Sequence, residues 1–137
     1  MKTALDSNIL SSLWSNEPSA RRISEELGKA RNLGAIVICG PVYVELAAHP
    51  TASHEFADRF LRDTGIAVEF LLEAPVWKRA AAGFANYAQR RRNSRGTSPK
   101  RLLADFLIAA HAALCADRLF TLDPSRYRQD FPELQLL

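Results

Sequence analysis

The sequence feature that most constrains the fold is an apolar run from Ala35 to Cys39, which lies between Gly34 and the pair Gly40-Pro41. The run has only five residues and is rich in β-branched side chains, which favours a strand buried on both faces. Glycine and proline stop a regular strand, and Pro41 suits the first turn of a helix. The sequence therefore predicts a short, buried parallel strand that is followed directly by a helix.

Other segments alternate between short apolar runs and helical patterns. Strands are predicted at residues 3–6, 66–70, 119–121 and 134–137, and helices at 8–14, 18–31, 40–49, 53–63, 75–92 and 99–115. Ser98 is a suitable N-cap and Pro99 a suitable first residue for the last helix. In the helix at 75–92, one apolar face is expected to contain Trp77, Ala81, Phe84 and Ala88. The alternation predicts an α/β fold with a central parallel sheet covered on both faces.

Composition and charge limit the class of protein without naming a function. The 137 residues suit a single domain over residues 1–137, and 24% of them are charged, which is usual for a globular protein. The net charge of +3 and the isoelectric point of about 9.1 permit a polyanionic partner such as RNA. Cys39 and Cys115 lie in apolar runs and are expected to be free thiols.

The apolar segments are too short to place the chain in a membrane. No long apolar stretch precedes Asp6, so no signal peptide is expected. The most apolar window, residues 102–115, is shorter than a bilayer-spanning helix and contains Asp105 and His111. The sequence therefore predicts a soluble protein of the cytoplasm with no membrane partner.

Three acidic residues are placed where the predicted strands end or on the helix that follows. Asp6 comes at the end of the first strand, Glu45 lies in the helix after the second, and Asp123 follows the strand at 119–121. In open α/β sheets, ligands bind beyond the carboxyl ends of the strands. We therefore expect these three acids, which are distant in sequence, to converge at one edge of one sheet.

Asp105 interrupts the apolar segment at residues 102–115, in which the only other polar side chain is His111. A helix that is apolar nearly all round is a buried one, and an ionised carboxylate inside it is costly unless it is paired or bound to a metal. No cation lies one helical turn away, although Arg101 is nearby. Asp105 therefore either pairs with a base distant in sequence or faces a polar cavity, whereas His111 is expected to be a hydrogen-bonded core histidine.

Acids gathered in one cavity repel one another, and some would protonate without a cation. Oxygen ligands suit Mg²⁺ or Mn²⁺ rather than zinc, and such ions act chiefly on phosphates, where they activate water. Each acid also has an ordinary interpretation when it is considered alone. Asp6 suits a helix N-cap, Glu45 an exposed helix residue, Asp123 a turn residue, and Asp105 a buried salt bridge.

The joint pattern resembles the PIN domain, and in particular the VapC-type toxins of bacterial toxin–antitoxin pairs. The resemblance extends over essentially the whole chain and rests on four motifs: Asp6-Ser7-Asn8, Val44-Glu45-Leu46, Asp105 to Ala109, and Thr121-Leu122-Asp123. It implies a three-layer α/β/α sandwich and a Mg²⁺- or Mn²⁺-dependent endoribonuclease that hydrolyses RNA phosphodiesters with metal-activated water. It also implies a homodimer and inhibition by a cognate antitoxin protein.

The resemblance also implies roles for individual residues. The catalytic and metal-binding acids would be Asp6, Glu45, Asp105 and Asp123. Asn8 and Thr121 match polar residues beside these acids and would orient carboxylates or waters. No motif can be matched to residues 50–73, where substrate choice is expected to be set.

The dense basic run at residues 90–101 has two interpretations. In the functional one, Arg91, Arg92, Arg95 and Lys100 bind RNA phosphates at the mouth of the site. In the other, these cations are solvated and suit the C-terminal end of a helix dipole.

Two other functions compete with the nuclease. The first is a non-catalytic PIN-like module that binds RNA or protein, although such a module would be expected to have lost some of the acids. The second is a phosphatase or a phosphoacceptor domain. The phosphatase should have Asp-x-Asp after the first strand, where this chain has Asp6-Ser7-Asn8.

Overall fold

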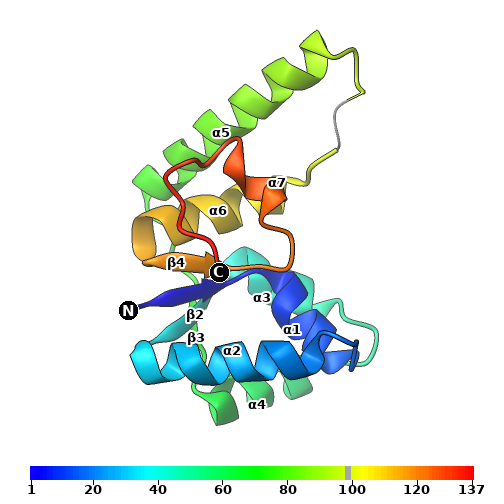
Figure 1. Ribbon diagram of the computed structural model, residues 1–137, viewed down its shortest axis with the longest axis vertical. Coiled ribbons are helices and arrows are strands. Elements are labelled where there is room, and N and C mark those ends of the chain that lie inside the picture. Colours follow the sequence, from blue (N-terminus) through cyan, green and yellow to red (C-terminus); the bar gives the residue numbers. More distant parts are fainter. Residues whose placement is uncertain (98–99) are drawn as a thin grey trace.

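A four-stranded parallel sheet in the order β3-β2-β1-β4 forms the middle of the structure (Figure 1). The computed structural model describes residues 1–97 and 100–137. The strands are β1 (Thr3–Leu5), β2 (Ile36–Cys39), β3 (Ala67–Glu69) and β4 (Arg118–Phe120). The apolar run that most constrains the fold is β2, and all four of its residues are buried. The predicted parallel sheet is therefore confirmed.

Helices cover both faces of this sheet, which gives the three layers of an α/β/α sandwich. Within the described ranges the helices are α1 (Ser7–Trp14), α2 (Ala20–Leu33), α3 (Gly40–Ala47), α4 (His54–Thr64), α5 (Ala74–Asn93), α6 (Leu103–Cys115) and α7 (Ser125–Arg128). Figure 1 shows α2 and α4 on one face, and α6 with α5 outside it on the other. In residues 1–97 and 100–137, every helix is too short or too polar to cross a membrane.

Two predicted boundaries differ from the structure at the C-terminal side of the chain. The predicted cap at Ser98 and Pro99 lies outside the described residues, and α6 begins only at Leu103, after a non-helical stretch at 100–102. The predicted strand at 134–137 is reduced to a single bridge between Leu119 and Leu136. A strand needs a continuous ladder of backbone pairs, and this terminal segment meets β4 at that one bridge.

The buried face of α5 is rotated from the predicted one. Its core residues are Val76, Ala80, Gly83 and Tyr87, whereas Trp77 is 52% exposed and Phe84 is 37% exposed. The helix is rich in alanine, so its apolar pattern is compatible with more than one buried face, and the smaller residues allow closer packing against α6. The predicted face instead lines a shallow groove of about 290 Å³ with Leu103 and Leu107 of α6.

Two buried polar residues outside the acid cluster, His111 and Asp130, have close partners. His111 is the hydrogen-bonded core histidine that was expected, with its Nε2 at 2.7 Å from a carboxylate oxygen of Glu69. Asp130, in the segment after α7, accepts a two-pronged contact from Arg90 and a 2.9 Å hydrogen bond from Asn86, both on α5. These contacts fasten the C-terminal segment to α5.

Gly83→Ala is expected to destabilise the protein, because a Cβ at this position would lie 2.8 Å from Cζ of the buried Phe131 ring. Such overpacking costs about 1–3 kcal/mol, which exceeds or cancels the roughly 1 kcal/mol that alanine gains over glycine in a helix. Gly28→Ala in α2 is the matched control, since nothing lies within 4 Å of its added Cβ. Urea denaturation should show a gain in stability for the control only. Equal gains would mean that Phe131 moves aside without cost.

Candidate functional site

The site begins where β1 and β4 end side by side. The backbone N–H of Asp6 donates to the carbonyl oxygen of Phe120 at 3.0 Å, so the residue after β1 lies against the end of β4. Asp6 occupies the N-cap position of α1, but its side chain makes no capping hydrogen bond to that helix. Its carboxylate is therefore directed to other partners, and the ordinary N-cap interpretation does not account for it.

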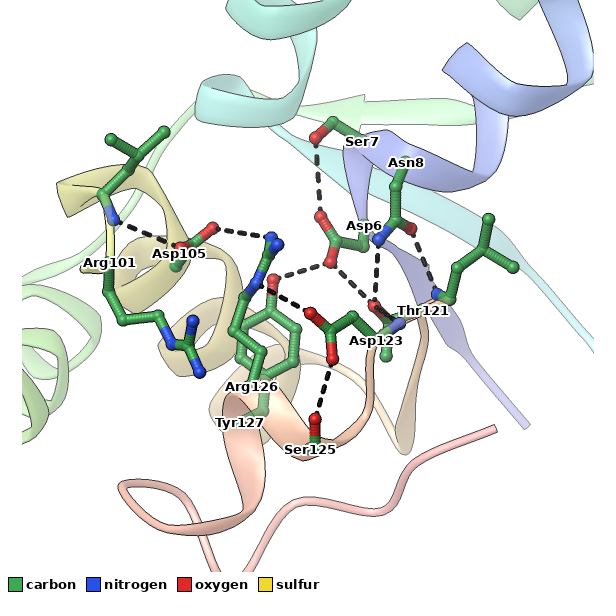
Figure 2. A network of polar contacts seen from close by, with 12 residues as sticks. Asp6, Ser7, Asn8, Arg101, Asp105, Thr121, Asp123, Ser125, Arg126 and Tyr127 are labelled. Carbon is green, nitrogen blue, oxygen red and sulfur yellow. Dashed lines mark hydrogen bonds and ion pairs between the residues drawn. The ribbon is translucent and has the colours of Figure 1, made fainter. Parts of the chain in front are cut away.

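The Asp6 carboxylate is 1% exposed and is held by two hydroxyl groups (Figure 2). Its Oδ2 accepts a 2.8 Å hydrogen bond from Thr121 and a 2.6 Å hydrogen bond from Tyr127. Burial raises the pKa of Tyr127, and the negative charge of Asp6 raises it further, so the phenol stays protonated as a donor. Among the described residues, Oδ1 has one long contact of 3.4 Å, with the Ser7 hydroxyl.

Asn8 and Thr121 connect the start of α1 to the segment after β4. Asn8 Oδ1 accepts from the backbone N–H of Leu122 at 3.2 Å, and its amide nitrogen lies 3.4 Å from the Thr121 hydroxyl. The same hydroxyl accepts from the backbone N–H of Asp123 at 3.1 Å. These two residues therefore lie where they can fix the relative positions of Asp6 and Asp123.

Asp105 lies in the first turn of α6 and is 8% exposed. Its Oδ2 accepts a 3.2 Å hydrogen bond from the Leu102 backbone, and its Oδ1 lies 3.5 Å from Nη1 of Arg126. Burial raises the pKa of Asp105, whereas Arg126 and, more weakly, Arg101 lower it. The base distant in sequence that the apolar segment requires is therefore Arg126, in α7.

Arg126 also pairs with Asp123, and its Nε lies 3.3 Å from Asp123 Oδ2. Figure 2 shows the guanidinium between Asp105 and Asp123, with Asp6 nearby. The other oxygen of Asp123 accepts a 2.8 Å hydrogen bond from Ser125. Asp123 is thus both the turn residue before α7 and a member of the acid cluster.

Glu45 approaches the cluster from α3. Burial raises its pKa, the hydrogen bond from Ser7 lowers it, and the negative charges of Asp6 and Asp105 raise it again. Its Oε1 atom is buried and has no hydrogen-bond partner within the described part of the chain. Glu45 therefore shares the electrostatic environment of the other acids and is not an ordinary exposed helix residue.

The donor chemistry of the cluster suits a hard divalent cation, because Asp6, Glu45, Asp105 and Asp123 offer only oxygen atoms. The unpartnered oxygen of Glu45 and the raised pKa values of Glu45 and Asp105 are features that a cation would relieve. As the side chains are placed, however, no three acidic, histidine or cysteine residues among residues 1–97 and 100–137 form a ready metal cage. The Arg126 guanidinium lies between two of the acids.

The predicted phosphate-binding residues divide into two groups. Lys100 is exposed in the stretch that enters α6, three residues before the turn that holds Asp105. Arg91 and Arg92 lie at the C-terminal end of α5, which projects from the body of the molecule in Figure 1, and Arg95 lies in the turn two residues after the helix ends. Arg92 donates to Gln89 of the same helix at 2.8 Å.

Sequence reasoning missed Arg126 and Tyr127. Both lie within four residues of Asp123 in an ordinary-looking turn, and neither belongs to a motif. The one available signal was indirect: a buried Asp105 without a local cation demands a base from elsewhere.

The fold and the site define a class: α/β domains with clustered acids at the carboxyl edge of a parallel sheet. The chain belongs to the PIN domain family, which matches residues 3–132. It is similar to a chain of VapBC-1 from nontypeable Haemophilus influenzae, at 22% identity and a TM-score of 0.66, over 100% of this chain and 97% of the other. It is also similar to a chain of VapBC2 from Rickettsia felis bound to a promoter DNA fragment, at 22% identity and a TM-score of 0.65, over 100% and 98%. None of the curated proteins compared with the chain matches it.

Glu45→Gln is expected to stabilise the metal-free protein at about pH 7. The pKa of Glu45 in the folded protein is raised above 4.5, so the ionised carboxylate is less stable in the folded state than in the unfolded state. At neutral pH the unfolded state is ionised and the fold carries this cost, whereas below the unfolded pKa both states are protonated and the cost disappears.

The gain from Glu45→Gln should therefore be present at neutral pH and vanish as the pH falls through the folded pKa to about 4. Urea denaturation in EDTA at both pH values measures it, with Glu17→Gln at an exposed position as the control. A gain of equal size at both pH values would show that charge burial is not its cause.

Proposed function

We propose that this chain is a Mg²⁺- or Mn²⁺-dependent endoribonuclease and the toxin of a toxin–antitoxin pair. The observation that carries the proposal is the approach of four acids from separate elements at the carboxyl edge of the sheet. Asp6 and Asp123 follow β1 and β4, Glu45 lies in α3, and Asp105 lies in α6. Such an oxygen-only cluster is suited to holding a divalent ion against a phosphodiester.

In this proposal Asp6, Asp105 and Asp123 hold the ion, and Glu45 completes the site. The bound ion supplies an activated water and offsets negative charge on the phosphate. Thr121 and Tyr127 keep Asp6 oriented by hydrogen bonding to its Oδ2, whereas Oδ1 makes a long contact with Ser7. Asn8 holds the backbone next to Asp123, so the acids on β1 and β4 keep a fixed separation.

The proposed partners are an antitoxin protein and a second copy of the chain. The similar solved structures are named as VapBC complexes, which supports an antitoxin as the inhibitor of this chain too. A symmetric homodimer is the commonest assembly among soluble oligomers. We place the protein in the cytoplasm, where its RNA substrate is.

A non-catalytic PIN-like module that binds RNA or protein is the second candidate. The observation that favours it is the pairing of Arg126 with both Asp105 and Asp123, which gives these two acids a counter-charge without a metal. The two functions are distinguished by RNA cleavage in the presence of a divalent ion, which only the nuclease carries out.

The first test is cleavage of a mixed cellular RNA pool by purified protein freed of any partner. Fragments are expected with Mg²⁺ or Mn²⁺ and not with EDTA. Asp105→Asn should reduce the rate by about a hundredfold or more, because one charge that holds the ion is removed. Asp63→Asn, an exposed change in α4, is the matched control and should leave the rate unchanged. A variant at position 105 that cleaves as fast as wild type would contradict the assignment.

A second test concerns the basic end of α5. If Arg92 and Arg95 contact phosphates, Arg92→Gln with Arg95→Gln should weaken single-stranded RNA binding and flatten its salt dependence. The slope of log affinity against log salt changes by about 0.7 per phosphate contact, hence by about 1.4 for two. Binding is measured in the Asp105→Asn background to prevent cleavage. The paired change Arg21→Gln with Arg22→Gln on α2 is the control. If the two double variants have the same slope, Arg92 and Arg95 do not contact phosphates.

A further inference from the structure

We propose that Arg126 is a built-in counter-cation that competes with the divalent ion for Asp105 and Asp123, and so sets the metal concentration at which the site fills. The inference rests on the proposed function, since it takes the acid cluster as the metal site. It assigns a positioning role to a residue outside the acids: Arg126 acts on the reaction through the carboxylates that it occupies.

Arg126 brings a positive charge into the acid cluster. The cluster places Asp105, Asp123 and Asp6 near one another, and Arg126 contacts two of them. A guanidinium is always protonated in proteins, so Arg126 carries a fixed positive charge at any physiological pH. A divalent ion among the same carboxylates would face this fixed positive charge unless the guanidinium moved away.

The contacts of Arg126 with the two carboxylates are long. Charge-assisted N–H···O bonds usually measure about 2.7–2.9 Å, whereas Arg126 lies 3.5 Å from Asp105 and 3.3 Å from Asp123. Its Nε atom is buried and has no hydrogen-bond partner in the described ranges. Arg79, by contrast, makes two hydrogen bonds of 3.0 and 2.8 Å to Glu133. Arg126 is therefore held by charge and can exchange with another cation.

Only the side chain of Arg126 has to move for an ion to take its place. The next residue, Tyr127, is buried and hydrogen-bonded to Asp6. The backbone N–H of Arg126 donates to the Asp123 carbonyl at 3.2 Å. These contacts fix the backbone of α7 against the site. The Arg126 side chain is 32% exposed, so the guanidinium can turn toward solvent while α7 stays in place.

The experiment compares Mn²⁺ binding by wild type, Arg126→Gln and Arg128→Gln in calorimetric titrations without RNA. Arg128 lies on the same short helix and is exposed, so it matches the change in net charge. Arg126→Gln should bind Mn²⁺ about tenfold more tightly, because a unit positive charge next to the ion is removed. Its melting temperature in EDTA should fall, because the acids lose their counter-cation. Arg128→Gln should change neither quantity.

A second measurement uses the folded wild type alone, in case Arg126→Gln folds poorly without metal. Titration with Mg²⁺ should shift the NMR signal of the Arg126 Nε–H group as its ion pairs break, and should leave that of Arg128 in place. Arg126→Lys identifies the signal by its loss.

The outcomes separate this inference from the proposed function. Equal Mn²⁺ affinities for wild type and Arg126→Gln, or an Arg126 signal that stays still as the site fills, would overturn competition and leave the metal site intact. An absence of Mn²⁺ binding by both proteins would overturn the metal site and the competition together.

Discussion

The site depends on the parallel pairing of β1 with β4. In the sequence, Asp6 and Asp123 are separated by almost the whole chain, yet the register Leu5 to Phe120 makes the residues that follow the two strands neighbours. Parallel strands end at the same edge, so the pairing delivers two carboxylates to one place without any long loop. The hydrogen bond from Thr121 to Asp6 then fixes their relative position.

Concentrating acids at a buried edge conflicts with stability, and the structure shows how the conflict is handled. Glu45 and Asp105 both have raised pKa values, because burial and mutual repulsion disfavour their charged forms. Asp6 receives two hydroxyl donors, and Asp105 and Asp123 share Arg126. Glu45 keeps a buried oxygen without a partner in the described part of the chain. The cluster is therefore tolerated in the folded protein without being fully satisfied, as is common where groups are held for chemistry rather than for stability.

Much of this architecture could be predicted because it is encoded locally. The run at Ala35–Cys39 became β2, and the placement of acids after strands anticipated the approach of Asp6 to Asp123, because strand direction alone fixes where strand ends meet. The prediction of the buried face of α5 was wrong for a physical reason. In an alanine-rich helix several faces are apolar, and the close approach of Phe131 and of Phe106 in α6 leaves room for Gly83 rather than Phe84 in the core.

The pairing of Arg126 with Asp105 could not be predicted from local sequence. The apolar surroundings of Asp105 already required a cation, but the chain has 18 lysine and arginine residues, and nothing in their spacing selects one. The selection is made by the docking of α7, in which Tyr127 reaches Asp6 and so presents the preceding residue to the acids. The hydrogen bond between Tyr127 and Asp6 therefore places Arg126 beside Asp105. The sequence shows that Asp105 needs a cation, but only the tertiary structure identifies Arg126 as that cation.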